Sequence, residues 1–229
     1  MTMMFSVSKY MILAVTILVT ITSAAFSEVS EDFYGYNKPV IPYENEIFFP
    51  SMGDIESYVM IDFFYNYDCM ECKEVSKFLT ERVNDKKDIR VIFHPIPQNE
   101  KEYEIALLEH ISFTEGKNLF SNIHQNIMNN VVVEEFSLKY TLQEIYSINQ
   151  ELAVNLFDKF ANEKKYNLGL NMSNEIARKA DVKSLPTLII NNKIFEISKN
   201  VDFKKIEEVI ILEKARVIQE ELSKKIGVN

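Results

Sequence analysis

The chain has 229 residues, of which 47% are hydrophobic and 26% charged, and it carries a formal net charge of −9. This composition is typical of a globular protein with a buried core and excludes an intrinsically disordered chain. The negative charge argues against nucleic acid as a partner, because phosphate binding requires a basic surface. The length suits one domain of moderate size, or one domain with a large insertion.

The first 25 residues have the layout of a secretory signal peptide. Lys9 precedes an apolar run over residues 10–21, and small residues follow at positions 23–25. The alternative is an uncleaved anchor, against which the run counts because it is shorter than the roughly 20 residues that span a bilayer. Cleavage after Ala25 or after Ser27 fits the pattern, and we expect the mature chain to be exported.

The next part of the chain predicts a strand–helix–strand unit. Residues 28–52 are read as an irregular lead-in with one short strand at 46–49. The β-branched and aromatic run at 58–65 is typical of a buried strand, and apolar residues then follow a helical spacing over 69–84. A second strand is predicted at 89–93, where Pro95 and Pro97 end it.

A long helical block follows the second strand. Asn149 and Ser173 occupy positions where helix N-caps are expected. Because the block is far longer than a normal crossover, residues 100–180 are expected to form an inserted all-helical subdomain. The helices predicted within it cover residues 103–115, 119–128, 142–148, 151–162 and 172–180.

The chain closes with a predicted hairpin and a helix. Strands at 185–190 and 193–197 are joined by Asn191 and Asn192, a favoured turn pair, and residues 202–226 form an amphipathic helix. The element order predicts an α/β fold with a mixed central sheet flanked by helices. Residues 26–99 and 181–229 are expected to form its two parts, on either side of the insertion.

The only two cysteines are spaced Cys69-Met70-Glu71-Cys72, at the junction of the first strand and its helix. A disulfide across so short a loop constrains the unfolded chain little, so reactivity explains the pair better than stability does. The helix N-terminus stabilises a thiolate, which makes Cys69 the expected attacking sulfur and Cys72 the resolving one. The alternatives are an inert disulfide and a metal site, which would require further ligands; no metal is expected.

The sequence resembles the DsbA-like family of periplasmic thiol–disulfide oxidoreductases. The resemblance is carried by F-F-Y-N-Y-D-C-M-E-C at residues 63–72, by S-L-P-T-L-I-I-N-N-K at 184–193, and by the helical insertion between them. It implies a thioredoxin-like fold, dithiol transfer to secreted proteins, and a cis proline at Pro186. It also implies that Leu185 offers its backbone to an extended substrate peptide. An ordinary trans proline that opens an edge strand is the alternative for Pro186.

The dipeptide inside the motif departs from the family pattern, in which strong oxidants often carry Pro-His. Here it is Met70-Glu71, and Asp68 precedes Cys69. Negative charges near a thiolate raise its pKa, so we expect a weaker oxidant, with Lys73 offsetting part of the effect. Alternatively, Glu71 points into water, where its charge is screened.

Asp62 is the candidate for the buried acid that many thioredoxin-like proteins carry in this strand. It lies seven residues before Cys69, whereas the family's acid usually lies six before. In a regular strand this slip turns the side chain to the opposite face, unless a bulge among residues 65–68 restores it.

Two further expectations concern neighbouring side chains. His94, at the end of the second strand, falls near a histidine found in related proteins, and we expect it to cap an element or face solvent. Four aromatic residues are expected to lie chiefly in the core, with one or two lining a substrate groove. They are Phe63, Phe64, Tyr65 and Tyr67.

The sequence as a whole predicts a monomeric oxidase that forms disulfides in unfolded or partly folded exported proteins. No cofactor is expected, because the cysteine pair is itself the redox centre. A membrane redox partner is needed to recycle the pair. The alternatives are a reductase or isomerase of the same fold and a non-catalytic binding module.

Overall fold

A five-stranded mixed sheet forms the centre of the protein. The computed structural model describes residues 49–86, 88–162, 167–197 and 200–226, so the predicted signal peptide lies outside the described residues. The strand order is β1-β3-β2-β4-β5, with β2 parallel to β3 and the other neighbours antiparallel. This confirms the predicted fold class. The strands are β1 (Ser51–Gly53), β2 (Val59–Tyr65), β3 (Ile89–Pro95), β4 (Thr187–Ile190) and β5 (Lys193–Glu196).

The two central strands are the ones with the longest apolar runs. Every residue of β3 is buried, as are all residues of β2 except the half-buried Met60. Parallel strands covered on both faces read as nearly continuous apolar runs, and both sequences have this character. Their register places Phe63 opposite Phe93 and Phe64 opposite His94.

Seven α-helices and one short 3-10 helix are described. Asn149 accepts a hydrogen bond from Leu152 N at the start of α6, which confirms it as an N-cap. No described helix is long and apolar enough to cross a membrane. The helices are α2 (Met70–Asp85), α3 (Glu100–Glu115), α4 (Lys117–Asn130), η2 (Val133–Glu135), α5 (Leu138–Ile148), α6 (Gln150–Ala161), α7 (Asn167–Lys179) and α8 (Phe203–Lys225).

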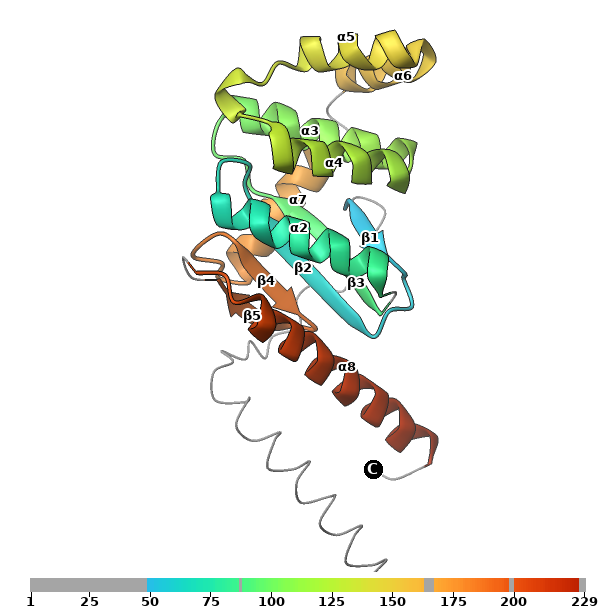
Figure 1. Cartoon of the computed structure of the whole chain (residues 1–229), viewed down its shortest axis with the longest axis vertical. Coiled ribbons are helices and arrows are strands. Elements are labelled where there is room, and N and C mark those ends of the chain that lie inside the picture. The colour runs from blue at the N-terminus through green and yellow to red at the C-terminus, as the bar shows by residue number, and fades with distance from the viewer. Residues whose placement is uncertain (1–48, 87, 163–166, 198–199, 227–229) are drawn as a thin grey trace, which may run out of the picture. The chain divides into compact units, whose positions relative to one another are not determined.

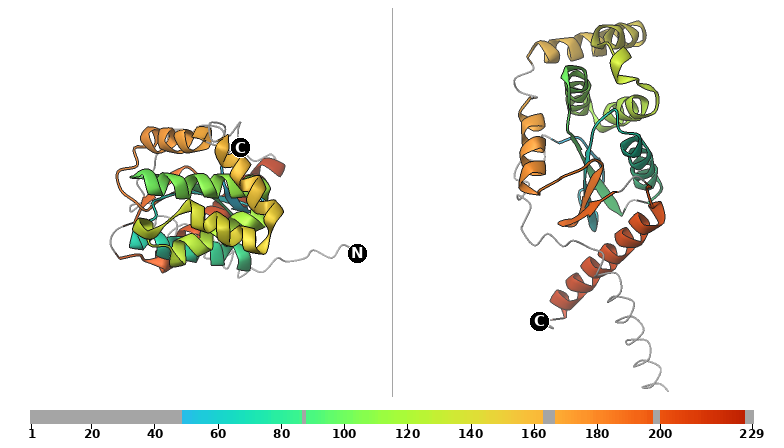
Figure 2. Two further views of the ribbon diagram at one scale, coloured as in Figure 1. Left: turned by 90° about the horizontal axis from the view of Figure 1, so that it is seen from above. Right: turned by 90° about the vertical axis from the view of Figure 1, so that its left-hand side faces the viewer.

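Helices cover both faces of the sheet. In the right-hand view of Figure 2, α2 and α7 lie on opposite sides of the strands. On the α7 side, Phe64, Ile92 and Ile189 pack against Ile176 and Ala177. The other helices of the inserted block are α3 to α6, and they lie beyond α2 and the sheet (Figure 1). Helices α5 and α6 pack on each other, and α6 packs on α3.

Several element boundaries differ from those predicted. The last two residues of the lead-in form β1 together with Gly53, whereas most of the strand predicted at 46–49 lies outside the described residues. Helix α3 begins at Glu100 because the Asn99 side chain accepts a hydrogen bond from Glu102 N. Strand β3 extends to Pro95. The proline does not end the pairing with β2, because the next residue, Ile96, donates its N–H to the carbonyl of Tyr65.

Ser173 is not the N-cap that was predicted. It lies inside α7, which begins at Asn167, and its side chain is fully buried. Its hydroxyl is hydrogen-bonded to His94 Nδ1 at 3.2 Å. Serine suits caps because its oxygen can satisfy a free backbone N–H, but here a tertiary contact uses the hydroxyl instead.

The hairpin between β4 and β5 forms as predicted. Asn191 and Asn192 both have positive φ, at 45° and 69°, as a two-residue turn of this kind requires. The side chain of Asn191 also reaches β2, where it accepts a hydrogen bond from Met60 N at 2.8 Å.

Ion pairs join α2 to α8 around Arg82. Its guanidinium donates to Asp88 at 2.6 Å and to Glu207 at 2.9 Å, and Lys214 Nζ also bonds to Asp88 at 2.9 Å. Burial by itself would raise the pKa of Asp88, but the hydrogen bonds from Arg82 and Lys214 outweigh it and lower the pKa to about 2.

This ion-pair network predicts an acid-sensitive contribution to stability. The folded-state pKa of Asp88 is lowered, so its stabilisation is present above the unfolded pKa of about 3.9 and disappears as pH falls through about 2. We expect the free energy of unfolding to decline less steeply between pH 4 and pH 2 in Asp88→Asn than in the parent chain. Urea denaturation at a series of pH values measures this slope.

Asp181→Asn is the control for this measurement. Among the described residues, Asp181 forms an ion pair with Lys183, and their side chains are 70% and 71% exposed. Asparagine also tolerates the positive φ of 56° at this position. An identical decline in Asp88→Asn and Asp181→Asn would contradict the prediction.

Candidate active site

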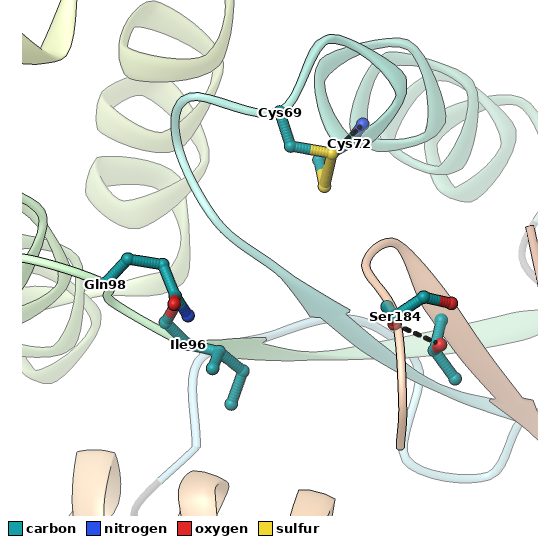
Figure 3. The surroundings of a disulfide bond; sticks show 6 residues. Cys69, Cys72, Ile96, Gln98 and Ser184 are labelled. Atoms are coloured by element: carbon teal, nitrogen blue, oxygen red, sulfur yellow. Dashed lines mark hydrogen bonds between the residues drawn. A yellow bond between two sulfur atoms is a disulfide. The ribbon is translucent and has the colours of Figure 1, made fainter. Parts of the chain in front are cut away.

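The two cysteines form a disulfide at the start of α2. Their Cα atoms lie 5.1 Å apart, and Cys69 is the N-cap residue, with its Sγ accepting from Cys72 N at 3.0 Å (Figure 3). Cys72 is fully buried, whereas Cys69 is only half-buried. Cys69 is therefore the more exposed residue of the pair.

The segment before β4 lies in the surroundings of the disulfide, where Figure 3 shows Ser184. The Leu185–Pro186 peptide bond is cis, as predicted. Pro186 is buried and Leu185 is half-buried. The hydroxyl of Thr187 donates to the carbonyl of Ser184 at 2.7 Å, which closes the turn into the strand. The role of Leu185 in peptide binding stays a prediction.

The loop after β3 also lies near the disulfide, although the sequence did not indicate it. Figure 3 shows Ile96 and Gln98 on this loop. The N–H of Ile96 donates to Tyr65 O at 2.7 Å, so the loop continues along β2 toward the cysteine motif. The N–H of Gln98 donates to Glu102 Oε2 at 2.6 Å.

The charged residues around the motif differ in exposure. Asp68 is exposed and Glu71 is half-buried in the first turn of α2, while Met70 is 68% exposed. The ammonium of Lys73 donates to the carbonyl of Val131, at the C-cap of α4, at 3.3 Å. The effect of Met70 and Glu71 on the redox potential stays a prediction.

Glu102 is a buried carboxylate between the two loops of the site. It accepts from the N–H of Gln98 and also interacts with the backbone N–H of Asp68, the residue before Cys69. Burial raises the pKa of Glu102 above its ordinary value, and the hydrogen bond from Gln98 offsets only part of this rise. One side chain of α3 therefore joins the loop after β3 to the loop that carries the attacking cysteine.

Asp62 lies away from the disulfide. The pairing of β2 with β3 is regular from Val59 to Tyr65, so no bulge interrupts the strand there, and Asp62 shares a face with Phe64. That face is the one covered by α7, not by α2. The structure therefore does not bring Asp62 together with Cys69. Its direction is the one that the seven-residue spacing gives in a regular strand.

His94 neither caps an element nor faces solvent, contrary to expectation. It is fully buried between Asp62, whose Oδ1 lies 2.9 Å from Nε2, and Ser173. Its ring also stacks on Phe64, with the centroids 4.7 Å apart. The expectation was wrong because α7, a segment distant in sequence, covers this strand end.

The four aromatic residues before the motif are all in the core. Their exposed fractions are 0–1%, so none lines a substrate groove, contrary to expectation. The hydroxyls of Tyr65 and Tyr67 donate to Glu109 Oε2 at 2.5 and 2.7 Å. Burial, followed by the charge of Glu109, raises the pKa of both tyrosines well above the ordinary value, so both remain protonated donors.

Sequence reasoning missed the buried polar residues that the helical block contributes. Glu102 and Glu109 lie seven residues apart in α3, on the same face as the buried Ile105 and Ser112. Two acids at helical spacing on an apolar face were the available signal. They become informative only once their partners are known, because charged residues are almost never fully buried unless they are paired.

Comparisons with known proteins agree with this geometry. The family model described as Thioredoxin matches residues 49–210. The search of curated proteins found no match. Among solved structures, the catalytic domain of Proteus mirabilis ScsC aligns with a TM-score of 0.62 at 19% identity, covering 75% of this chain and 92% of that one.

Two further solved structures show the same fold. BdbD from Bacillus subtilis, in its oxidised form, aligns with a TM-score of 0.59 at 19% identity, covering 73% of this chain and 93% of that one. Wolbachia pipientis α-DsbA1 aligns with a TM-score of 0.61 at 17% identity, covering 79% and 96%. With its disulfide at the start of α2, the chain belongs to the thioredoxin family and has the fold of the DsbA-like thiol–disulfide oxidoreductases.

Proposed function

We propose that this protein is an exported oxidase that forms disulfides in unfolded or partly folded secreted proteins through Cys69 and Cys72. The observation that carries the proposal is the unequal exposure of the two sulfur-bearing residues at the N-terminus of α2. Cys72 is fully buried and Cys69 half-buried, so the bond is open to attack at one sulfur.

The reaction is a dithiol–disulfide exchange in two steps. A substrate thiolate attacks Cys69 Sγ, the Cys69–Cys72 bond breaks, and Cys72 leaves as a thiolate that takes up a proton. A second substrate thiolate then attacks the substrate sulfur of the mixed disulfide, and Cys69 leaves. Two electrons pass from the substrate dithiol to the cysteine pair, and the two substrate thiol protons pass to solvent or to the leaving thiolates.

The site supports each step with local chemistry. The free N–H groups of the first turn of α2 favour the thiolate of Cys69 as the leaving group. Pro186 and Leu185 lie in the segment that precedes β4, where the backbone of Leu185 is proposed to pair with an extended substrate. To turn over, the reduced pair passes its two electrons to a disulfide of a membrane redox partner. We propose a monomer in the periplasm, with residues 100–180 as its helical subdomain.

The reduction potential of the cysteine pair tests the direction of the reaction. The full sequence is expressed in a Gram-negative host, the protein is purified from the periplasm, and its disulfide is equilibrated with glutathione. A value near the oxidising end of the range, about −120 mV, supports an oxidase, whereas one near about −270 mV makes a secreted reductase the better assignment. Regain of activity by reduced, unfolded ribonuclease gives an independent measure of oxidation.

The same preparation tests the other parts of the proposal. N-terminal sequencing after Ala25 or after Ser27 supports export with cleavage, and an intact Met1 contradicts it. A stable dimer in light scattering would favour an isomerase. A disulfide that mild reduction does not open would instead favour a binding module that holds a partner protein without catalysis.

A further inference from the structure

A chain of buried polar groups runs from α3 to α2. Glu109 Oε1 lies 2.6 Å from His124 Nδ1, and His124 Nε2 lies 2.7 Å from Ser76 Oγ. The other carboxylate oxygen accepts from Tyr65 and Tyr67. These five residues, here called the Glu109 network, are all at most 2% exposed.

Two members of the Glu109 network flank the cysteine motif in the sequence. Tyr67 lies two residues before Cys69, and Ser76 lies four residues after Cys72 on α2. Four residues of helix correspond to about 6 Å of rise, so Ser76 is one turn below the resolving cysteine. The carboxylate of Glu109 is therefore held near the first turns of the helix that carries the disulfide.

The hydrogen bonds around Glu109 fit a carboxylate that only accepts. The hydroxyls of Tyr65 and Tyr67 donate to Oε2, and His124 Nδ1–H can donate to Oε1 while the Ser76 hydroxyl donates to Nε2. Three hydrogen bonds then reach the Glu109 carboxylate. Among the described residues, no lysine or arginine forms an ion pair with it. The titratable groups that surround it are Tyr65 and Tyr67 from β2, His124 from α4 and His110 from its own helix.

We propose that Glu109 is a positioning residue whose buried charge tunes the Cys69–Cys72 pair toward a less oxidising potential. The inference rests on the proposed redox function and assigns the tuning acid to α3 of the helical block instead of β2. The dipole of α2 stabilises the Cys69 thiolate, and a negative charge beneath the same turns opposes it. Water does not screen this charge, because the network is buried.

A second carboxylate–histidine–serine chain offers a matched comparison. Asp62, His94 and Ser173 are likewise buried and hydrogen-bonded, at 2.9 and 3.2 Å. They lie on the face of the sheet covered by α7, opposite α2. The two chains share their chemistry and differ in their position relative to the disulfide.

The experiment compares Glu109→Gln with Asp62→Asn in the full chain purified from the periplasm. In Glu109→Gln, the amide oxygen can accept from both tyrosines and the amide nitrogen can donate to His124 Nδ1, with the other tautomer donating to Ser76. The variant thus keeps the hydrogen bonds and removes the charge. Near-ultraviolet circular dichroism checks that the packing is retained.

We expect Glu109→Gln to shift the equilibrium constant with glutathione at least about fivefold toward the reduced protein. Since a tenfold change in this two-electron equilibrium is about 30 mV, this corresponds to about 20 mV. The pKa of Cys69, followed by thiolate absorbance in the reduced protein, is expected to fall. Asp62→Asn is expected to change the equilibrium less than twofold.

Four results would overturn the inference. A change below twofold in Glu109→Gln, or equal changes in the two variants, shows that the charge of Glu109 does not act on the cysteines. If Glu109→Gln does not fold, Glu109→Leu/His124→Leu replaces the carboxylate and the imidazole by apolar side chains, and the same fivefold shift is required of it. A parent disulfide that never equilibrates with glutathione overturns the proposed function as well, which distinguishes the two failures.

Discussion

In Cys69→Ser, oxidation of a reduced protein substrate is expected to fall at least about a hundredfold, because the attacked sulfur and the disulfide are both lost. Cys69 is the N-cap residue of α2, and serine is among the preferred residues at that position. The helix therefore keeps its cap, so the loss is chemical and not structural. The rate at which reduced ribonuclease regains activity measures it, and an unchanged melting temperature supports the interpretation.

Cys72→Ser is the matched control for this prediction. It retains the half-buried Cys69 and removes only the resolving thiol, so a substrate disulfide that reacts with Cys69 is trapped as a mixed disulfide. A covalent adduct on a non-reducing gel is expected from Cys72→Ser and not from Cys69→Ser. Adducts through Cys72 in Cys69→Ser would contradict the assignment of roles.

Phe93→Ala is expected to lower the free energy of unfolding by about 3–5 kcal/mol, the usual cost of removing a buried aromatic ring. The ring is fully buried on β3 and contacts Phe63, Phe120 and His124, with centroid distances of 6.1, 5.2 and 4.5 Å. It therefore joins the central strands to α4. Such a loss is a large share of the roughly 5–15 kcal/mol that holds a typical protein folded. Urea denaturation measures it.

Ile148→Ala provides the comparison for Phe93→Ala. Ile148 ends α5 and is 87% exposed, so truncating it removes little packing, and we expect a change within about 0.5 kcal/mol. A loss below about 1 kcal/mol in Phe93→Ala would show that the core between sheet and helices can collapse around the cavity, contrary to the packing described here.

Most elements were predictable because their signals are local. The run at residues 58–65 and the pair Asn191–Asn192 specify β2 and the β4–β5 turn by hydrophobic pattern and by tolerance of positive φ. Strand β1 was missed because three residues carry too short a pattern, and its pairing with β3 defines it. Helix α5 begins four residues earlier than predicted, and none of its residues is buried, so no packed side chain marks its start.

Some residues of the candidate site could be predicted from local sequence signals and others could not. Cys69 and Cys72 are recognisable from spacing and from their place at a strand–helix junction, and the cis Leu185–Pro186 bond follows from the resemblance. Asp62 was the candidate for the buried acid, and its seven-residue spacing left its direction open between a regular strand and a bulge, because side-chain parity along a strand is a local property. Neither Glu102 nor Glu109 was singled out from the sequence.

The sequence by itself determined the mixed sheet, the helical insertion and the redox motif, since each depends on residues close together in the chain. Only the tertiary structure decided which buried acid lies beside that motif. Glu109 is hydrogen-bonded to Tyr65, which lies 44 residues away in the sequence, and His94 is hydrogen-bonded to Ser173, which lies 79 residues away. A buried charge is stable only where other groups supply its hydrogen bonds. Here those groups come from distant segments, and a local sequence pattern does not predict which segments will pack together.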